Sequence, residues 1–577
     1  MTDGSKADER SPLLARVQTP TGKPSHDVEA AEPPLDVAGE FWSLSSMALQ
    51  VALSTFARLA LTAIDSAFLG HLGTTALAAS ALATTWTTVP LMAVWAGASA
   101  LLTLCGQSWG AKNGALTGVW LQMGLVLTTA LTIPVFAWFW SVGFVLEWST
   151  DDEEVVRLGV RFARILSLSI WPSLTYACVR LYFQAMGIMA PTTIVGAASI
   201  VVAIVANYFL IFGCFGWQGL GFDGSPLATV VASCFQPIAL IGYCIMYKKM
   251  HRQAWAGWDF SMFTRERFAI FMQVAGPDAA SSMIAALSSS ALTLIAARLG
   301  PDVIAANAVI SSLWALIWAL FWGYGCATQI RVANYLGANR PKAARLLAVL
   351  GGCCTVVTVL ALAIATVVVR ENVFLAFTDV DDLLQLCLLV LPIFVVDFIL
   401  DSVDVLVTAV LTAMSEAAIT AWVSSLGTWV VELPLAYFGA ITLGYGFPAL
   451  WYSIGIMEIT KLGIYAVVMA RVDWTAMAHR AATNMENPDA VQSDSANEGN
   501  DYGTTGTANH QDGTDSARQD KEREAAVELA LAEGEILPAR SPPAPLALTP
   551  SSQLQQQQRR HQWGDSEPMN QSHEVSV

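Results

Sequence analysis

The sequence predicts an all-α integral membrane protein with twelve transmembrane helices, arranged as two pseudo-symmetric six-helix bundles with disordered cytoplasmic tails. Three observations support this fold class: the composition, the number of long apolar runs and an internal repeat. The 577 residues are 54% hydrophobic and only 13% charged, with a mean hydropathy of +0.51. A soluble globular protein carries about 25% charged residues, so the composition excludes an ordinary soluble enzyme.

Long apolar runs give the number of helices. A helix that crosses a bilayer needs about 20 mostly apolar residues. Twelve such runs, separated by Gly, Pro or charged residues, lie near 41–70, 75–105, 115–146, 155–187, 189–213, 226–249, 268–298, 303–335, 342–370, 381–414, 417–440 and 447–471.

An internal repeat divides these runs into two halves, because four short motifs recur 225 to 228 residues further along the chain. The pairs are His71-Leu72-Gly73 with Arg298-Leu299-Gly300, Gly110-Ala111-Lys112-Asn113 with Gly337-Ala338-Asn339-Arg340, Ala185-Met186-Gly187 with Ala413-Met414-Ser415, and Gly219-Leu220-Gly221-Phe222 with Gly444-Tyr445-Gly446-Phe447. Each half holds six runs, so both halves enter the membrane in the same orientation, as in parallel-repeat transporters. Two such bundles predict a central cleft that either side of the membrane can open.

The distribution of charge predicts the orientation. The formal net charge of -16 is concentrated at the two ends of the chain and excludes a nucleic-acid partner, which needs a basic surface. Cytoplasmic loops are enriched in Lys and Arg. With both termini in the cytoplasm, the loops on that side contain Lys112, Lys248, Lys249, Arg252, Arg265, Arg267, Arg340, Lys342, Arg345, Arg471 and Arg480.

The domain boundaries follow from these segments. We expect an N-terminal tail, a first bundle, a cytoplasmic linker, a second bundle and a mostly disordered acidic C-terminal tail at 1–40, 41–250, 251–267, 268–472 and 473–577. The tail is rich in Asn, Asp, Gly, Ser and Gln, a composition that cannot bury a core. Near the N-terminus, Glu9, Leu13 and Leu14 fit an acidic dileucine sorting signal read by an adaptor, although a plain polar tail explains them equally well.

Ionisable residues at bilayer depth are costly and therefore mark functional sites. Asp65 lies late in the first run and is expected to bind and release a proton or a sodium ion. Arg58 stands two helical turns before it, so a static ion pair is the alternative. Asn207, midway along the fifth run, is expected to complete the site with Asp65, or else to join helices through hydrogen bonds.

The tenth run contains the densest group of acids. Asp397, Asp401 and Asp404 fall at i, i+4 and i+7, which places them on one face of a helix. That face must point into the bundle or the cleft, and we expect it to form a coupling or substrate site in which Asp401 takes the leading part. Charged carboxylates this close repel each other, which favours binding of a proton or another cation.

Other polar and aromatic residues give further candidates. Asp278 follows Pro277 about ten residues into the seventh run, Glu432 stands beside Pro434, and Glu458 with Lys461 is expected to be a structural pair. Candidate substrate-lining residues are the aromatic Trp314, Trp318 and Tyr324, together with Glu432. Aromatic faces attract organic cations, but a packing stripe of Trp314, Trp318 and Trp322 is the simpler interpretation. We found no catalytic, cofactor or metal motif, so no enzyme activity and no cofactor is expected.

Several motifs, in order along the chain, resemble those of the multidrug and toxic compound extrusion (MATE) family in its eukaryotic form. They are Asp65-Ser66-Ala67-Phe68-Leu69-Gly70-His71-Leu72-Gly73, Leu104-Cys105-Gly106-Gln107-Ser108-Trp109-Gly110-Ala111-Lys112, Tyr182-Phe183-Gln184-Ala185, Gly219-Leu220-Gly221-Phe222 and Val332-Ala333-Asn334-Tyr335-Leu336-Gly337-Ala338. The resemblance covers about residues 40–470. It implies a V-shaped pair of bundles that exports small organic molecules in exchange for protons or sodium ions.

The resemblance also assigns positions. Asp65 matches the first-helix aspartate of prokaryotic members, whereas Asp401 and Asn207 match residues of the sodium-coupled bacterial branch. The seventh-helix glutamate of plant and animal members is replaced by Ala285, and a second acidic position by Ser290. We therefore expect coupling to rest on Asp65 and the tenth-helix acids, with Asp278 as a candidate replacement.

The sequence thus predicts a monomeric antiporter in a vacuolar, lysosomal or plasma membrane, with a small organic substrate, a coupling ion and the bilayer as its partners. Organic cations, xenobiotics and secondary metabolites are the expected substrates. Alternatives are an exporter of citrate-like organic anions, a flippase for lipid-linked precursors and, from a different class, an ion channel. Scarce embedded Lys and Arg argue against a pyrophosphate-binding flippase, and a channel would not need a two-bundle repeat.

Overall fold

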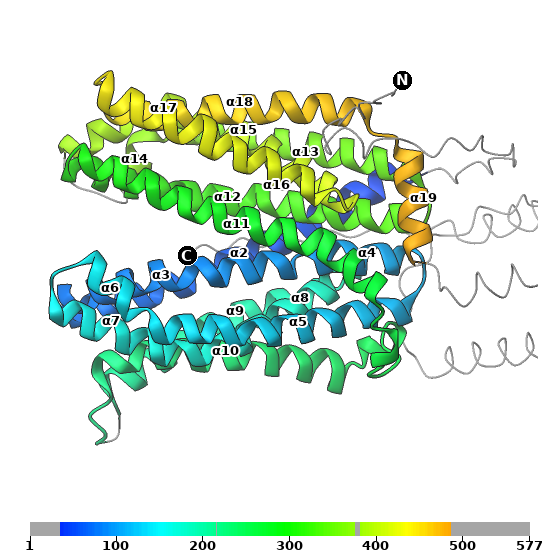
Figure 1. The fold of residues 1–577 in the computed structure, drawn as a ribbon, viewed down its shortest axis with the longest axis horizontal. Helices are drawn as coiled ribbons and strands as arrows, with labels where there is room; N and C mark the ends of the chain where they lie inside the picture. Colours follow the sequence, from blue (N-terminus) through cyan, green and yellow to red (C-terminus); the bar gives the residue numbers. More distant parts are fainter. Residues whose placement is uncertain (1–34, 215, 376–380, 486–577) are drawn as a thin grey trace, which may run out of the picture. The chain divides into compact units, whose positions relative to one another are not determined.

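The computed structural model describes residues 35–214, 216–375 and 381–485, and in these ranges the chain is helical almost throughout (Figure 1). The chain divides into two units, 1–492 and 493–577, and every described residue belongs to the first. The dileucine residues Glu9, Leu13 and Leu14 and most of the acidic tail lie outside the described residues.

The predicted fold class and helix number are confirmed, since twelve helices of the described chain are long and apolar enough to span a membrane. They cover Val37–Leu72, Thr74–Gly110, Gly114–Ser141, Glu153–Ala185, Ala190–Phe212, Gly221–Tyr247, Arg265–Ala296, Asp302–Gly337, Pro341–Val368, Leu383–Ala413, Ala417–Thr442 and Phe447–Arg471.

Helices of the first half are α2 (Val37–Leu72), α3 (Thr74–Ala98), α4 (Ala100–Gly110), α5 (Gly114–Ser141), α6 (Gly143–Ser149), α7 (Glu153–Leu166), α8 (Ile170–Ala185), α9 (Ala190–Phe212) and α10 (Gly224–Ile241). Those of the second half are α11 (Arg265–Arg298), α12 (Pro301–Gly337), α13 (Pro341–Val368), α14 (Arg370–Leu375), α15 (Asp381–Ala413), α16 (Ala417–Leu426), α17 (Leu433–Tyr437) and α18 (Phe447–Arg471). A final helix, α19 (Trp474–Met485), follows them.

Helix starts are explained by local chemistry. The side chains of Asp36, Asn113 and Thr264 each accept a hydrogen bond from a backbone N–H in the first turn of the helix that follows. Such caps satisfy donors that have no partner within the helix. Prolines stand at the starts of α12, α13 and α18, where their missing N–H costs nothing.

Several of the long spans are interrupted, and the breaks in the second and the eleventh span lie beside candidate site residues. The second span breaks at Ser99, between α3 and α4. The eleventh changes to a wider π-helical turn over Gly427–Glu432, just before Pro434. A proline cannot donate a backbone hydrogen bond, and π turns often occur at functional sites. The first break lies at Ser99 and the second ends at Glu432, so each stands at a polar side chain.

The backbone confirms the internal repeat. Gly73 and Gly300, 227 positions apart, have φ values of 123° and 121°. Matching residues of the other three motif pairs also have positive φ: Lys112 with Asn339, Gly187 with Ser415, Gly219 with Gly444 and Gly221 with Gly446. Positive φ is uncommon outside glycine, so the same turns recur in the same order in both halves.

Long helices of each half pack mainly against one another and run side by side (Figure 1). In the first half α2 packs on α9, α9 on α10 and α5 on α8. In the second half α12 packs on α13 and α15, and α15 packs on α18. Contacts between the halves join α2 and α4 to α12, and α3 to α11. These pairs come from the repeat-related first two spans of each half.

The linker between the halves is anchored to the first half. Gln122 on α5 donates to the carbonyl of Gly257 at 2.6 Å and accepts from the N–H of Asp259 at 3.0 Å. The hydroxyl of Tyr182 donates to the carbonyl of Ala254 at 2.9 Å. These bonds fix a segment that has no long helix of its own.

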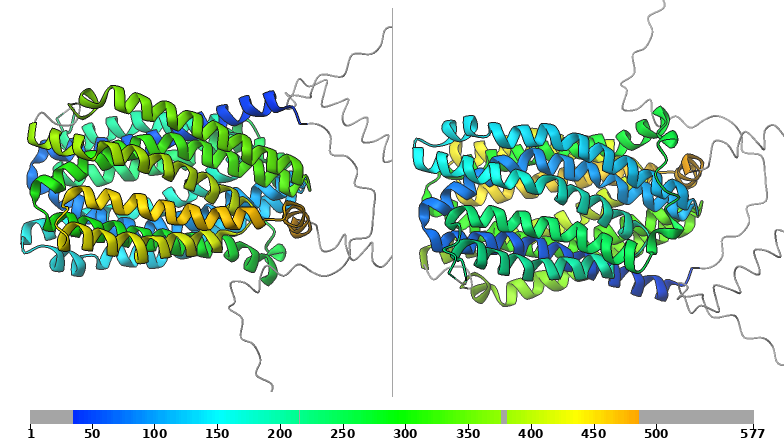
Figure 2. Two further views of the ribbon diagram at one scale, coloured as in Figure 1. Left: turned by 90° about the horizontal axis from the view of Figure 1, so that it is seen from above. Right: turned by 90° about the horizontal axis from the view of Figure 1, so that it is seen from below.

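One boundary differs from the prediction. The sequence analysis placed everything after 472 in a mostly disordered tail, but Trp474–Met485 form α19, which lies across one end of the long helices (Figures 1 and 2). Ala478, Ala481 and Met485 are buried, and α19 contacts α4, α12 and α13. An apolar stripe of small residues thus holds the start of the tail against both halves.

Candidate functional site

The first candidate site is centred on Asp65 of α2. Its Oδ1 accepts a hydrogen bond from Asn207 Nδ2 on α9 at 2.8 Å, and its Oδ2 accepts one from Thr229 Oγ1 on α10 at 2.8 Å. Asn207 is fully buried, and its Oδ1 has no hydrogen-bond partner. The carboxylate and the amide oxygen together provide hard oxygen donors, the type that binds a proton or an alkali cation. The predicted pairing of Asp65 with Asn207 is present.

Arg58 does not pair with Asp65, which removes the static ion pair as an explanation of that acid. The Arg58 guanidinium lies over the ring of Trp95, with Cζ 5.1 Å from the ring centroid. Among the described residues, no ion pair joins Arg58 to Asp65.

The second candidate site lies between α15 and α18. Lys461 Nζ is 3.0 Å from Asp404 Oδ2 and 3.0 Å from Glu458 Oε1, so one ammonium group bridges two carboxylates. Carboxylate oxygens of Asp401, Asp404 and Glu458 all lie within 4.8 Å of one another. Asp401 and Asp404 thus share a face, as predicted. Glu458 and Lys461 form the expected pair, and Asp404 joins it, so the pair is part of the same cluster.

Asp397 sits one turn away on α15 and is fully buried. Neither of its carboxylate oxygens has a hydrogen-bond partner. It packs closely on α18 at Gly455, where a Cβ atom would come within 2.5 Å of Asp397 Oδ1. A buried charged carboxylate without partners is strongly unfavourable, so this arrangement favours a group that holds a proton or waits for a cation.

Glu432 adds a further buried acid to this region. It ends the π turn of the eleventh span, which packs against α18, and only 5% of its surface is exposed. At the same turn Gly427 lies against the Lys461 side chain, where a Cβ would be 2.9 Å from Cγ. Among the described residues, five acids and Lys461 thus lie in this part of the second half.

Asp278 occupies a different place, between the halves. Its Oδ2 accepts a hydrogen bond from Ser99 Oγ at 3.1 Å. Ser99 belongs to the break between α3 and α4, whereas Asp278 belongs to α11. This acid therefore joins the second span to the seventh, and it lies apart from the five-acid cluster.

The tryptophan stripe of α12 packs against other aromatic rings, although Trp322 is itself exposed. Trp314 lies against Phe394 and Trp451, with ring centroids 5.8 and 5.9 Å away. Trp318 stacks on Trp322 at 4.8 Å. Tyr324 is half-buried against the core cluster that both halves share. Their arrangement supports the packing interpretation, and the substrate-lining role stays a prediction.

Side chains at one end of the helices join the two halves in a repeated pattern. Gln107 Nε2 on α4 donates to the carbonyl of Ala413 at 2.8 Å. Its repeat-related partner on α12 is Asn334, whose amide nitrogen, turned to face acceptors, meets the carbonyl of Ala185 at 3.3 Å and that of Gly106 at 2.8 Å. Ala185 and Ala413 are themselves a repeat pair, so the contact obeys a pseudo-two-fold axis.

Two glycines allow this close approach. A Cβ on Gly110 would lie 1.9 Å from the carbonyl oxygen of Asn334, and one on Gly337 would lie 1.9 Å from that of Gln107. Only glycine lets the ends of α4 and α12 pack at this distance. We name these four residues, Gln107, Gly110, Asn334 and Gly337, the end latch.

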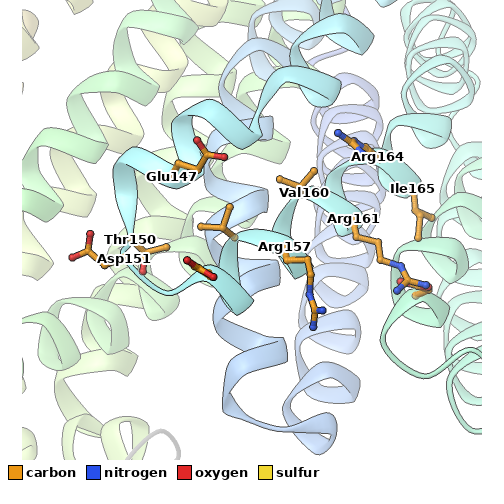
Figure 3. A pocket seen from close by; sticks show the side chains of 11 residues that line it. Glu147, Thr150, Asp151, Arg157, Val160, Arg161, Arg164 and Ile165 are labelled. Carbon is orange, nitrogen blue, oxygen red and sulfur yellow. The ribbon is translucent and has the colours of Figure 1, made fainter.

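The helix ends away from α19 carry a cavity of about 980 Å³ (Figure 3). It is lined by Glu147 of α6 and by Arg157, Arg161 and Arg164 of α7, with other residues. Arg157 pairs with Glu154 at 3.5 Å, whereas Arg161 pairs with Asp223, before α10. Arg164 lies over the ring of Trp140, at 5.4 Å.

Some site residues could not be recognised from the sequence. Thr229 and Ser99 are ordinary small polar residues, and only their contacts with Asp65 and Asp278 set them apart. Gln107 and Asn334 stand three residues before the repeated motifs that begin at Gly110 and Gly337, so the repeat was a usable signal for the end latch. Arg180, which shares the ring of Trp95 with Arg58, gave no sequence signal.

Comparison with known proteins agrees with this arrangement. Residues 51–209 and 277–438 match the MatE family. The chain is 27% identical to "Multidrug and toxin extrusion protein 2" of Mus musculus over 447 residues, 77% of each chain. It is 24% identical to "Protein DETOXIFICATION 16" of Arabidopsis thaliana over 79% of this chain and 92% of the relative.

Solved structures show the same fold. The crystal structure of the eukaryotic MATE transporter AtDTX14 matches with a TM-score of 0.71 and 23% identity, over 78% of this chain and 99% of that one. An outward-facing multidrug resistance MATE family transporter matches with a TM-score of 0.65 and 15% identity, over 77% and 96%. With two family matches that cover both halves and a fold of twelve apolar helices, the chain belongs to the MatE family of multi-pass membrane transporters.

Proposed function

We propose that this protein is a secondary active antiporter that exports small organic molecules in exchange for protons or sodium ions. Organic cations, xenobiotics and secondary metabolites are the expected substrates. The main support is an imbalance of buried charge. Asp397, Asp401, Asp404, Glu432 and Glu458 lie in one part of the second half, and among the described residues the base that bridges two of them is Lys461. They cannot all be charged at bilayer depth without bound cations.

Coupling of ion and substrate movement then follows if the two halves exchange between two arrangements, each open to one side of the membrane. A cation bound at Asp65 and Asn207, or among the acids of α15, neutralises charge that is otherwise buried. If it binds one state more tightly, it shifts the population toward that state by the difference in binding free energy. Substrate that favours the opposite state completes the exchange.

Opening the end at which α19 lies requires the end latch to separate. The hydrogen bonds of Gln107 and Asn334 to the opposite half contribute about 1 kcal/mol each. A closure of this strength is strong enough to favour one state and weak enough for ion binding to reverse it. Its pseudo-two-fold symmetry supports a rocking motion in which both halves move alike.

We place both termini in the cytoplasm and the protein, as a monomer, in a vacuolar, lysosomal or plasma membrane. Support for the orientation comes from the basic residues at the helix ends near α19, among them Lys112 and Arg340, which line a cavity of about 520 Å³ there. Cytoplasmic ends of membrane helices carry such an excess.

Gradient-driven transport tests the proposal. The full-length protein is reconstituted in liposomes under an imposed proton or sodium gradient, and uptake of radiolabelled tetraethylammonium and of organic anions is measured. We expect uphill accumulation of at least one compound that stops when the ion gradient is collapsed. Accumulation that is indifferent to every ion gradient, or no accumulation of any compound, would contradict antiport.

Variants identify the coupling groups. Asp65→Asn and Asp401→Asn should each lower coupled export tenfold or more, because the amide cannot exchange a proton and binds cations weakly. Asp151→Asn, in an exposed loop, is the matched control and should transport normally. Unchanged export and pH dependence in both site variants would exclude these acids as coupling groups.

A further inference from the structure

Two arginines in the first half share one tryptophan. The Cζ atoms of Arg58 on α2 and Arg180 on α8 lie 5.1 and 5.0 Å from the centroid of Trp95 on α3. Arg180 also lies over the ring of Tyr176, at 5.9 Å. Three different spans therefore bring two positive charges to one indole ring.

Neither guanidinium has an acidic partner in the part of the chain that the structure describes. Among the described residues, neither Arg58 nor Arg180 forms an ion pair, and Nε of Arg180 is buried without a hydrogen-bond partner. The nearest acid along α2 is Asp65, whose two oxygens are already bonded to Asn207 and Thr229. The pair thus carries two positive charges that the protein itself does not neutralise.

Such an arrangement is unfavourable unless an anion completes it. Charged side chains within transmembrane segments normally pair with one another or with backbone carbonyls. Attraction to an aromatic face is weaker than an ion pair and does not offset repulsion between two like charges. A guanidinium fork matches the two oxygens of a carboxylate, so one or two carboxylates would satisfy both arginines.

The position of the pair suits a substrate. Tyr176 belongs to a core cluster that also contains Ala275 of α11 and Cys326 of α12, both from the second half. Trp95 lies on α3, which packs against α11. A ligand held by these arginines would therefore lie near the junction of the halves, whose relative movement exposes it to one side or the other.

We infer that Arg58 and Arg180 form a binding site for the carboxylate of a small organic anion. This inference rests on the proposed antiport function, and it puts organic carboxylates in place of the organic cations expected there. Trp95 and Tyr176 position the two guanidinium groups, and the acids of the second half remain available for the coupling ion.

Equilibrium binding tests the site without requiring transport. Benzoate and citrate are titrated into the full-length protein in detergent, with chloride, inorganic phosphate and tetraethylammonium as comparison probes. We expect one or both carboxylates to bind saturably and to raise the Tm of the unmutated protein. Arg58→Gln and Arg180→Gln should each weaken that binding tenfold or more, whereas Arg157→Gln, an exposed arginine of α7, should bind normally.

Several outcomes would overturn the inference. These are saturable binding of tetraethylammonium alone, preference for chloride or phosphate over both carboxylates, or equal carboxylate binding by the two site variants. If either variant fails to fold, Arg58→Lys and Arg180→Lys serve instead, because they keep the charge but lose the two-pronged guanidinium group. An unchanged carboxylate affinity in both lysine variants would also contradict the inference.

Gradient-driven uptake separates the carboxylate site from the antiport function. Uphill transport of tetraethylammonium without carboxylate binding would contradict only the carboxylate site. Carboxylate binding without gradient-driven transport would contradict only the antiport function.

Discussion

At the scale of single residues, Lys461 neutralises part of the negative charge of the buried acids in the second half. It is almost fully buried and bridges Asp404 on its neighbour α15 and Glu458 on its own helix. Breaking a buried ion pair by removing one partner leaves the other charge uncompensated, which costs more than the pair itself contributes. Lys461 thus has a structural role within the cluster that we propose binds the coupling cation.

Replacing this lysine should therefore destabilise the protein. Lys461→Met is expected to lower the free energy of unfolding by about 3–5 kcal/mol, because the carboxyls of Asp404 and Glu458 lose their cation. Thermal unfolding in detergent measures the change. The matched control Lys249→Met, at an exposed position, should unfold like the unmutated protein. Addition of Asp404→Asn should recover part of the loss, and equal stability of Lys461→Met and the control would contradict the bridging role.

At the scale of elements, the repeat explains why one end of the molecule can close tightly. The ends of α4 and α12 are repeat copies of each other and meet through Gly110 and Gly337. Each copy sends an amide side chain to the far half, so a single motif, used twice, provides both sides of the contact. Because of this symmetry, one favourable contact geometry, present in the repeated motif, accounts for both sides of the interface.

A methyl group in this contact should disturb it. Gly110→Ala places a Cβ 1.9 Å from a backbone carbonyl oxygen, so α4 and α12 must move apart, and the Tm is expected to fall by several degrees. Gly70→Ala, with no atom within 4 Å of its new Cβ, is the matched control. It should be neutral or slightly stabilising, since alanine favours a helix over glycine by about 0.5–1 kcal/mol. Equal melting of the two variants would show that the glycine contact is not tight.

At the scale of the whole molecule, α19 connects parts of both halves. Asn113 Nδ2, at the start of α5, donates to the carbonyl of Met485 at 2.9 Å, and Arg480 Nη2 donates to the carbonyl of Met414 and to Glu416, each at 2.8 Å. The helix thus bonds to the loop after α4 in one half and to the loop after α15 in the other. It lies across the end that the end latch closes.

Two truncations separate α19 from the tail that follows it. Deletion of residues 486–577 should leave transport intact, because that composition cannot build a core. Deletion of 473–577 also removes the buried face of α19 and should lower the Tm and alter the transport rate. Uptake by reconstituted full-length and truncated proteins measures both. Complete loss of transport in the shorter deletion, despite normal expression, would contradict the tail prediction.

The fold was predictable because the bilayer imposes simple rules on the sequence. Length and hydropathy set the twelve spans, and the motif pairs around Gly73 and Gly300 revealed a repeat that the backbone angles reproduce. The acids of α15 were also predictable, since a spacing of i, i+4 and i+7 fixes a helix face whatever surrounds it. Asp65 and Asn207 stood out because polar groups are rare in apolar runs.

What the sequence by itself determined is therefore the number of helices, their duplication and the identity of the embedded acids, all of which depend on local composition and period. Tertiary structure alone decided the partners: Thr229 for Asp65, Ser99 for Asp278, Lys461 for Asp404, and the shared ring of Trp95 for Arg58 and Arg180. These contacts join residues up to about 180 positions apart, and helical periodicity carries no information about which faces of two distant helices meet. The packing of the halves decides which faces meet, and therefore which buried charges are paired and which are not.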